Sequence, residues 1–462
     1  MQSALPEKLI ESLSNAPGFD RTAFEEVHAT GRQVTSVRIN PFKISSSELA
    51  DEITSSTPIE ITQVPWSSFG YYLSERPSFT LDPLLHAGCY YVQEASSMFL
   101  EQAIKQSADV SRPLKVLDLC AAPGGKSTLI QSLITPDSLL VSNEVIKTRT
   151  TILQENITKW GAANVVVTSN DPKDFSRLEN FFDLIVIDAP CSGSGLFRRD
   201  PSAIEEWSES NVMLCSQRQQ RIVSDALPAL KKGGILIYCT CSYSVAEDES
   251  VVDWLCDEFS LQGLQLSIDP SWNIVESFSE NKTPCYRFYP DKVKGEGFFL
   301  SCLQKPDGDL TTLHSGKSRT ERLTKNELQV VLPWMGTDAG MFIFRHKEDV
   351  IAVPPSFESQ IPLLQDRLYL RQAGINMGKL ANNELIPHHA LALSTLLNNS
   401  ITKIPLDREQ ALQYLRKAEV LPVAGVKGWA LIRYNGHNLG WVKVLSNRVN
   451  NYYPKEWRIL KS

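Results

Sequence analysis

The feature that most constrains the fold is a series of short apolar segments that recur through residues 85–303 of this 462-residue chain. Most of them are apolar at consecutive positions, as strands are when helices cover both faces of a sheet. Between them lie longer stretches with the apolar spacing of amphipathic helices. This alternation predicts a doubly wound, Rossmann-like α/β core. Its strands are expected at Lys115–Asp118, Leu139–Asn143, Asn164–Thr168, Asp183–Asp188, Ile235–Cys239 and Gly297–Leu303.

The chain is longer than one hydrophobic core usually organises, and roughly 150 residues per domain gives a prior of about three domains. Composition and pattern suggest where they divide. We expect a small α+β domain at residues 1–84, the α/β core at 85–303, a linker and intermediate region at 304–385, and a basic, β-rich domain at 386–462.

Local patterns add detail outside the core. Apolar and polar positions alternate over Val34–Asn40, which predicts a strand. The polar residues from Gln304 through Ser318 are typical of an exposed linker. Near the C-terminus we expect a helix at Ala390–Asn398, strands at Gly428–Tyr434 and Leu439–Val444, and a hairpin turn at Asn435-Gly436.

The composition, with 42% hydrophobic and 21% charged residues, is ordinary for a globular protein. No apolar run approaches the roughly 18 residues of a membrane span, and the first residues lack the features of a secretory signal. We therefore expect a cytoplasmic protein with no membrane partner. The nine cysteines follow no disulfide spacing, and Cys239 with Cys241 forms only a C-x-C, so we expect free thiols and no metal site.

A net charge of −7 argues at first against a nucleic-acid partner, but its distribution reverses that impression. Residues 425–462 carry a net charge of +6, which leaves −13 for the rest of the chain. Bases interleaved with aromatics offer phosphate attraction and stacking surfaces, which favours RNA contact. The alternative is a small β domain whose aromatics form its core. The residues concerned are Lys427, Arg433, Lys443, Arg448, Lys455, Arg458 and Lys461, with Trp429, Tyr434, Trp441, Tyr452, Tyr453 and Trp457.

A glycine turn follows the first core strand. The strand ends at Asp118 and leads through Cys120-Ala121-Ala122-Pro123-Gly124-Gly125-Lys126 into a predicted helix. Free backbone N–H groups and the helix N-terminus favour an anionic group of a ligand there. Nucleotide, dinucleotide and methyl-donor sites all use such turns. A phosphate loop of the Walker A type is disfavoured because Cys120 stands where that pattern requires glycine.

Two acids follow the next strands of the predicted sheet. Glu144 lies 26 residues after Asp118, near the spacing at which an acid binds a ribose diol in this fold. Asp171 follows the third strand, where an adenine ring would lie. For Asp171, a role in capping the turn is an equally good interpretation.

Two cysteines end the fourth and fifth strands. Cys191 follows Asp188-Ala189-Pro190, and Cys241 follows Thr240. Consecutive parallel strands usually neighbour one another, so these thiols, 50 residues apart in sequence, are expected close together at the ligand-binding edge of the sheet. A single cysteine is more often an inert buried residue, which is our interpretation of Cys215 and Cys256.

Three motifs occur in order: Cys120–Lys126, Asp188–Gly195 and Tyr238–Ser242, the last followed by Glu247, Asp248 and Glu249. They resemble those of the S-adenosylmethionine-dependent RNA cytosine-C5 methyltransferases of the NOL/NOP/Sun family. Cys239, where the family often has Ser, and Val245-Ala246 are minor departures that remove no catalytic group. Supporting matches are Ser36–Asn40, Gly88–Ser97 and Gly295–Phe299, and Leu439–Pro454 resembles the PUA-related region of the bacterial RsmF-type enzymes that modify 16S rRNA.

The resemblance implies a role for each candidate residue. Cys241 would attack carbon 6 of a cytosine, Asp188 would meet the N3 edge of the base, and Cys191 would assist release of the carbon-5 proton. Lys126 would hold the base or lower the pKa of a thiol. S-adenosylmethionine would contact Cys120, Ala121, Ala122, Pro123, Gly124, Gly125, Lys126, Glu144, Asp171 and Asp188, and RNA would contact the N-terminal α+β domain and the PUA-like C-terminal domain.

Other functions compete with RNA methylation of 16S rRNA. DNA cytosine methylation uses the Pro-Cys cysteine as attacker, and the additional Thr-Cys at Cys241 speaks against it. The substrate within RNA is open between rRNA and tRNA. A third possibility is an RNA-binding ribosome assembly factor that keeps the fold without turnover, which the intact set of Cys241, Cys191, Asp188 and Glu144 disfavours.

Overall fold

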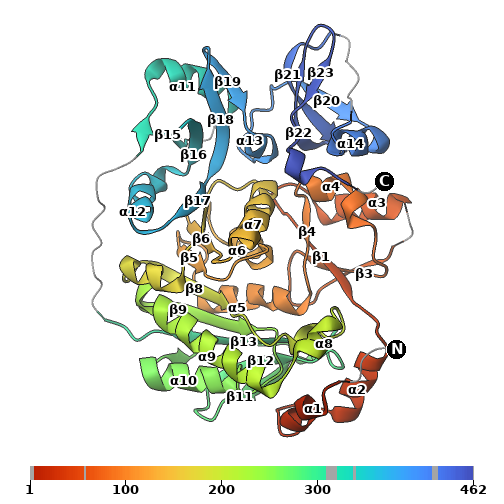
Figure 1. Cartoon of the computed structure of the whole chain (residues 1–462), viewed down its shortest axis with the longest axis vertical. Helices are drawn as coiled ribbons and strands as arrows, with labels where there is room; N and C mark the ends of the chain where they lie inside the picture. The colour runs from red at the N-terminus through yellow and green to blue at the C-terminus, as the bar shows by residue number, and fades with distance from the viewer. Residues whose placement is uncertain (1–4, 57–58, 309–319, 337–339, 419–424, 461–462) are drawn as a thin grey trace.

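The computed structural model describes residues 5–56, 59–308, 320–336, 340–418 and 425–460. These residues form four sheets, with the largest at the centre and the two sheets of the C-terminal half beside each other at one end (Figure 1). The linker expected from Gln304 to Ser318 is described only through Gly308, and its remainder lies outside the described residues. No described helix is long and apolar enough to cross a membrane.

The central sheet confirms the predicted Rossmann-like core. Its strands follow the order β11-β12-β13-β9-β8-β5-β6-β7-β17, and β10 pairs with β13. The neighbours from β9 to β7 are parallel. These parallel strands are β5 (Lys115–Asp118), β6 (Leu139–Asn143), β7 (Val165–Thr168), β8 (Phe182–Asp188) and β9 (Leu230–Thr240).

Antiparallel strands extend the sheet at both edges. The segment expected at Gly297–Leu303 forms β13, which runs antiparallel to β9. The sequence patterns do not predict β10, β11, β12 or β17, because each strand is short and only partly apolar. The antiparallel strands are β10 (Gln262–Gly263), β11 (Val275–Phe278), β12 (Pro284–Phe288), β13 (Phe298–Gln304) and β17 (Leu370–Ala373).

Helices cover both faces of the core sheet, which explains why its strands are apolar throughout. Val116 and Val186 pack with residues of the helices on one face, whereas Leu117 and Ile185 pack with residues of the helices on the other. Alternate side chains of a strand point to opposite faces, so the central positions of these strands are buried on both faces. The first face carries α5 (Leu100–Ser107), α6 (Gly125–Leu133) and α7 (Lys147–Trp160), and the second carries α9 (Glu209–Ala226) and α10 (Glu249–Phe259).

The N-terminal part folds as an antiparallel sheet with the order β2-β3-β1-β4. The strand predicted at Val34–Asn40 is present as β1 (Thr35–Ile39), and β4 (Tyr90–Val92) lies beyond the boundary expected at residue 84. Arg38 of β1 is fully buried and donates to Gly125 O at 3.2 Å and to Thr128 Oγ1 at 2.5 Å in α6. The other elements are α1 (Glu7–Leu13), α2 (Arg21–Ala29), α3 (Ser46–Ser56), β2 (Ile61–Gln63), β3 (Gly70–Leu73) and α4 (Pro83–His86).

The C-terminal half contains two more sheets. The first has the order β14-β15-β16-β18-β19 and the second β20-β21-β22-β23. Their elements are β14 (Glu321–Arg322), α11 (Lys325–Val331), β15 (Phe342–His346), β16 (Asp349–Val353), α12 (Gln360–Arg367), β18 (Ile375–Ala381), β19 (Glu384–Pro387), α13 (His389–Leu393), β20 (Lys403–Leu406), α14 (Arg408–Leu415), β21 (Gly428–Tyr434), β22 (His437–Val444) and β23 (Val449–Asn451).

The hairpin predicted at Asn435-Gly436 is confirmed, because β21 and β22 pair antiparallel with Tyr434 opposite His437. Both turn residues have positive φ, 42° and 82°, as a type I′ turn requires. The helix predicted at Ala390–Asn398 is too long. Helix α13 ends at Leu393, because the backbone at Ser394 is extended and Thr395 N donates to Gly161 O at 3.2 Å instead.

Most aromatics of the basic tail are structural. Trp441, Tyr453 and Tyr434 are buried in the last sheet, as the alternative of a small β domain expects for them. Tyr452 is 40% exposed and stands with its ring centroid 4.5 Å from that of Trp429. The tail therefore offers fewer stacking surfaces than its composition suggests.

Candidate active site

The glycine turn connects β5 to α6 as predicted. Gly124 caps the N-terminus of α6 with φ +118°, a conformation that favours glycine. A Cβ at Gly124 would also stand 3.3 Å from Leu153 Cδ1 of α7. The turn thus lies tightly against α7 and leaves the backbone N–H groups at the start of α6 available to an anionic group.

Asp118, at the end of β5, is fully buried beneath this turn. Its Oδ2 accepts a hydrogen bond from Ser127 Oγ at 2.6 Å, whereas Oδ1 has no hydrogen-bond partner among the described residues. Burial raises the pKa of Asp118 to about 7. A buried carboxylate oxygen without a hydrogen bond lowers the stability of the fold. Asp118 Oδ1 therefore calls for a functional explanation, and it lies beside the turn that is expected to bind a ligand.

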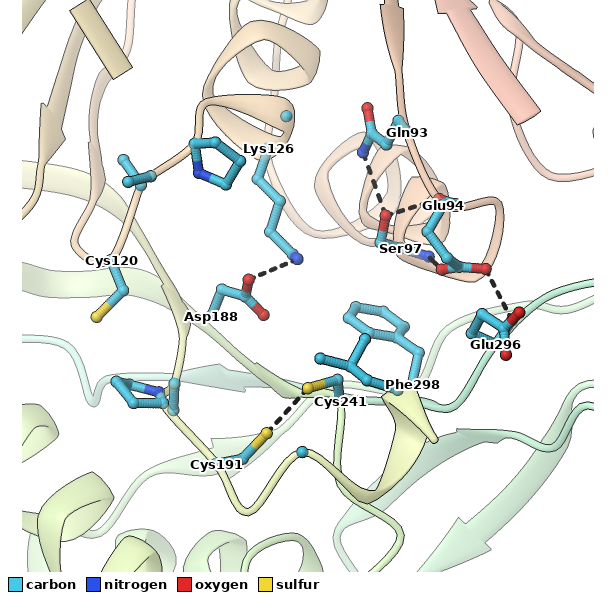
Figure 2. Close-up of a pocket in the computed structure, with 18 of the residues that line it drawn as sticks. Gln93, Glu94, Ser97, Cys120, Lys126, Asp188, Cys191, Cys241, Glu296 and Phe298 are labelled. Atoms are coloured by element: carbon cyan, nitrogen blue, oxygen red, sulfur yellow. Dashed lines mark hydrogen bonds and ion pairs between the residues drawn. The ribbon is translucent and has the colours of Figure 1, made fainter. Parts of the chain in front are cut away.

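A cavity of about 510 Å³ opens in front of the turn, at the carboxyl ends of the parallel strands (Figure 2). It is bounded by the glycine turn, by the loops after β8 and β9, and by the start of β13. Among the predicted site residues, the cavity is lined by Cys120, Ala121, Ala122, Pro123, Gly125, Lys126, Asp188, Cys191 and Cys241. Gly124, Glu144 and Asp171 are not part of this lining.

The two cysteines meet in the cavity, with Cys191 Sγ and Cys241 Sγ 3.0 Å apart (Figure 2). Each follows one of the neighbouring parallel strands β8 and β9, where Asp188 lies opposite Cys239. Gly195 N donates to Cys241 O at 2.7 Å, and a Cβ at Gly195 would stand 2.2 Å from that oxygen. The glycine therefore permits the close approach that brings the loops together.

The pKa of the Cys191 thiol lies well above its ordinary value. The hydrogen bond with Cys241 is the largest cause, followed by burial and by the negative charges of Cys241 and Glu247. In the absence of a ligand, Cys191 therefore holds its proton and can donate it toward the Cys241 sulfur.

An ion pair lies beside the cysteines. Lys126 Nζ is 2.7 Å from Asp188 Oδ2 and 5.3 Å from the centroid of the Phe298 ring. Burial opposes the positive charge of Lys126, but the Asp188 carboxylate outweighs it and leaves the pKa of this lysine above its ordinary value. Asp188 also lies 3.7 Å from the buried Cys239 Sγ, measured from Oδ1. The site thus presents a cation, a carboxylate and two sulfurs to one space.

A buried carboxylate, Glu247, holds the two cysteine loops together. Its Oε1 accepts from Ser192 N at 2.8 Å, and its Oε2 accepts from Ser192 Oγ at 2.5 Å and Ser242 Oγ at 2.6 Å. Gln219 Nε2 of α9 donates to Oε1 at 3.2 Å. Each serine follows one of the two cysteines in sequence, so Glu247 sets the position of both sulfurs without lining the cavity.

Comparison with known proteins identifies three matching family models along the chain. They are described as the N-terminal domain of 16S rRNA methyltransferase RsmF (residues 5–95), 16S rRNA methyltransferase RsmB/F (residues 108–304) and the methyltransferase RsmF PUA domain (residues 401–459). A relative from Aeromonas salmonicida, ribosomal RNA small subunit methyltransferase F, is 31% identical over 441 residues that cover 91% of this chain and 90% of that protein. The chain belongs to the RsmF-type methyltransferase family.

Solved structures show the same core. A methyltransferase homologue protein from Pyrococcus horikoshii is 27% identical, with a TM-score of 0.52 over 65% of this chain and 100% of that one. NSun6 from Pyrococcus horikoshii, solved with SFG, shares the fold at a TM-score of 0.55 and 19% identity, over 67% of this chain and 100% of that one. The resemblance stated from the motifs and the predicted fold class are both confirmed.

RsmB/F methyltransferases depend on S-adenosylmethionine, which confirms the cofactor predicted from the sequence. The residues present fit this molecule in part. Small side chains and free N–H groups at the glycine turn suit its carboxylate. The carboxylates of Asp188, in the cavity, and of Asp118, beneath the turn, suit its positively charged groups.

The predicted ribose contact, Glu144, is covered by an arginine that the sequence interpretation missed. Arg149 of α7 lies 3.5 Å from Glu144 Oε2, measured from Nη1, and its Nη2 donates to Ala122 O at 2.7 Å. Ile146 N donates to Glu144 Oε1 at 2.9 Å. A ribose diol would therefore have to displace the half-exposed Arg149 guanidinium, so the contact stays a prediction.

Asp171 caps a turn, as the alternative interpretation of it expects. Its side chain accepts from Lys173 N at 3.2 Å and lies 4.0 Å from Arg221 Nη1. The adenine contact assigned to it likewise stays a prediction.

Two arginines follow the Cys191 loop. Arg198 is buried and pairs with Glu296, with Nε and Oε2 3.7 Å apart. Burial raises the pKa of Glu296 to about 7. Arg199 is exposed and lines the cavity. The sequence interpretation missed Glu296, although its place within the Gly295–Phe299 motif could have identified it as a site residue.

Proposed function

We propose that this RsmF-type methyltransferase methylates carbon 5 of a cytosine in 16S rRNA through a covalent adduct between Cys241 and carbon 6. The observation that carries the proposal is the pair of sulfurs 3.0 Å apart in the cavity in front of the glycine turn. The name of the Aeromonas salmonicida relative supports RNA of the small ribosomal subunit as substrate, and a ribosomal substrate supports the cytoplasm as the place of reaction.

Carbon 5 of cytosine is too weak a nucleophile to take a methyl group directly. Addition of the Cys241 thiolate to carbon 6 makes carbon 5 electron-rich, which divides one difficult step into easier ones. Because this addition places negative charge on the ring, Asp188 would face the N3 edge and share a proton with N3, while its pairing with Lys126 fixes its orientation. S-adenosylmethionine supplies the methyl group as an electrophile.

Cys191 would remove the proton from methylated carbon 5, after which the bond between Cys241 and carbon 6 breaks. The raised pKa of Cys191 bears on this step, since its largest cause is the hydrogen bond with Cys241. Once Cys241 is a neutral thioether, that hydrogen bond and the repulsion from its negative charge are lost. Two causes of the raised pKa are then removed while burial remains, which favours loss of the Cys191 proton to solvent and leaves a thiolate that can take the carbon-5 proton.

The target base would enter the cavity alone. A cytosine stacked within a duplex cannot reach Cys241, so we expect the nucleotide to be unpaired or flipped out.

Single substitutions of the two cysteines test the proposal. Cys241→Ala is expected to abolish methyl transfer to a 16S rRNA transcript, and Cys191→Ala to accumulate a protein–RNA adduct that survives denaturing electrophoresis. Cys215→Ala, a buried cysteine of α9 outside the cavity lining, is the matched control and should retain activity. Normal product release by Cys191→Ala would show that the division of labour between the cysteines is wrong.

Bisulfite sequencing of RNA from cells with and without the gene tests the substrate. A signal lost from 16S rRNA supports the proposal, a signal lost from tRNA would make the enzyme a tRNA methyltransferase, and an unchanged profile would favour an RNA-binding assembly factor without turnover.

A further inference from the structure

A second cavity, of about 220 Å³, lies away from the catalytic one, where three parts of the chain meet. Phe42, Lys43 and Ala87 come from the N-terminal part, Leu393 ends α13, and residues 394–395 and 397–399 follow it. Lys403 and Arg433 belong to β20 and β21 of the last sheet. Figure 1 shows the last sheet and α13 at the same end of the molecule as α4 and the upper end of α7.

The described residues that line this cavity include two lysines, one arginine and no acid. Lys43, Lys403 and Arg433 supply the positive charges. Within the part of the chain that the structure describes, neither Lys403 nor Arg433 has an ion-pair or hydrogen-bond partner for its charged group. The Nε atom of Arg433 is buried without an acceptor. The Thr395 hydroxyl and the Asn399 side-chain amide add hydrogen-bond donors to the lining, whereas the Ser394 hydroxyl donates to Leu391 O at 2.9 Å.

Lys43 contributes a cation that no carboxylate neutralises. Its Nζ donates to Ala87 O at 2.8 Å and to Lys159 O at 2.6 Å, so only neutral carbonyls receive its protons. Burial lowers the pKa of Lys43 to about 8, which reflects the cost of holding this charge without a counter-ion. Glu48, which acts electrostatically on His437 of the lining, does not itself line the cavity.

We propose that this basic cavity binds a phosphate group of the RNA backbone. Clustered cations with uncharged donors are the chemistry by which proteins hold RNA phosphates without reading sequence. The assignment rests on the proposed function, in which the substrate is RNA, and it places a specific contact beside the hairpin of β21 and β22 rather than on the exposed aromatics of the tail.

The cavity is remote from the reacting base. Lys159, whose carbonyl accepts from Lys43, is in the last turn of α7, and α7 begins three residues after Glu144. A helix of 14 residues spans roughly 20 Å at 1.5 Å per residue. A phosphate bound here would position the RNA and take no part in methyl transfer, so its loss should change affinity and leave the chemical step unchanged.

The test uses the full chain, a naked 16S rRNA transcript and the double variant Lys403→Gln with Arg433→Gln. We expect the dissociation constant to rise about tenfold and the slope of its logarithm against log salt to fall by about 1. The single-turnover rate at saturating RNA should not change. The matched control, Lys325→Gln with Lys232→Gln, removes two exposed cations far from the cavity lining and should bind like the unmodified protein.

A charge-preserving pair, Lys403→Arg with Arg433→Lys, separates charge from packing and should bind within about threefold of the unmodified protein. The inference is overturned if the neutral pair binds as tightly as the control, or if the charge-preserving pair loses as much affinity as the neutral pair. Failure of the proposed function is distinguishable, because it would appear as absence of cytosine methylation by the unmodified protein, whereas these outcomes concern RNA binding alone.

Discussion

At the scale of single residues, the site depends on a carboxylate that touches no reacting atom. Glu247 accepts hydrogen bonds from the serine after each cysteine, so one side chain sets the separation of the sulfurs. An amide in its place keeps one acceptor oxygen. Its NH2 group would face either the two hydroxyls or the donors Ser192 N and Gln219 Nε2, so two donors would lose their acceptor. Small displacements of reacting groups reduce rates steeply, because catalysis depends on orientation.

Glu247→Gln is therefore expected to lower kcat by about tenfold to a hundredfold, with the KM for S-adenosylmethionine nearly unchanged, as measured by methyl transfer to 16S rRNA. Glu101→Gln is a suitable control, since Glu101 is equally buried and accepts from Ser67 Oγ at 2.8 Å but holds neither of the cysteine loops. If both variants lose stability and keep the same kcat, Glu247 has no positioning role.

At the scale of elements, the glycine turn between β5 and α6 is held by α7. The φ of +118° at Gly124 and the contact of 3.3 Å from a Cβ to Leu153 leave little space for another residue. Alanine there would add backbone strain of about 1–2 kcal/mol and push the turn away from α7. The N–H groups at the start of α6 would move with it.

Gly124→Ala should thus weaken S-adenosylmethionine binding about tenfold or more, measured by calorimetry. Gly428→Ala introduces similar strain at φ +86° but meets no atom within 4 Å, so it should reduce thermal stability without affecting cofactor affinity. Equal affinity of Gly124→Ala and Gly428→Ala for S-adenosylmethionine would mean that the glycine turn tolerates a side chain.

At the scale of the whole molecule, Arg38 joins the N-terminal sheet to the methyltransferase core. It donates to Gln93 Oε1 at 2.8 Å and to Gly125 O at 3.2 Å, and its guanidinium lies 4.6 Å from the centroid of the Trp160 ring. Arg38→Met would leave buried acceptors unsatisfied. The expected cost is about 3 kcal/mol in the free energy of unfolding.

Chemical denaturation of Arg38→Met measures that cost, and Arg408→Met is its control. Arg408 also bridges two parts of the chain and donates to Leu81 O at 3.2 Å, but it is exposed. Its substitution should therefore change the free energy of unfolding only slightly. Similar small effects in both variants would indicate that the N-terminal sheet is held by apolar contacts alone.

The sequence by itself determined the α/β core, because its strands are buried on both faces and therefore apolar at every position. It also located the glycine turn and the two cysteines, since glycine and strand-end positions carry local signals. The antiparallel strands β11 and β12 and the edge strand β17 lack such a signal, because they are short and mix polar with apolar residues, and such strands are stabilised mainly by their neighbours.

Only the tertiary structure decided which distant groups meet. The strand order predicted that the two cysteines lie near each other, but the 3.0 Å between their sulfurs, the cover that Arg149 forms over Glu144, and the contacts of Glu247 are decided by packing. The same holds for Lys43, which follows β1 of the N-terminal sheet and lines one cavity with Lys403 and Arg433 of the last sheet. The conformational preferences of neighbouring residues determine where helices and strands form. The packing of their apolar faces then determines which loops lie together, and the polar groups of the site lie in those loops.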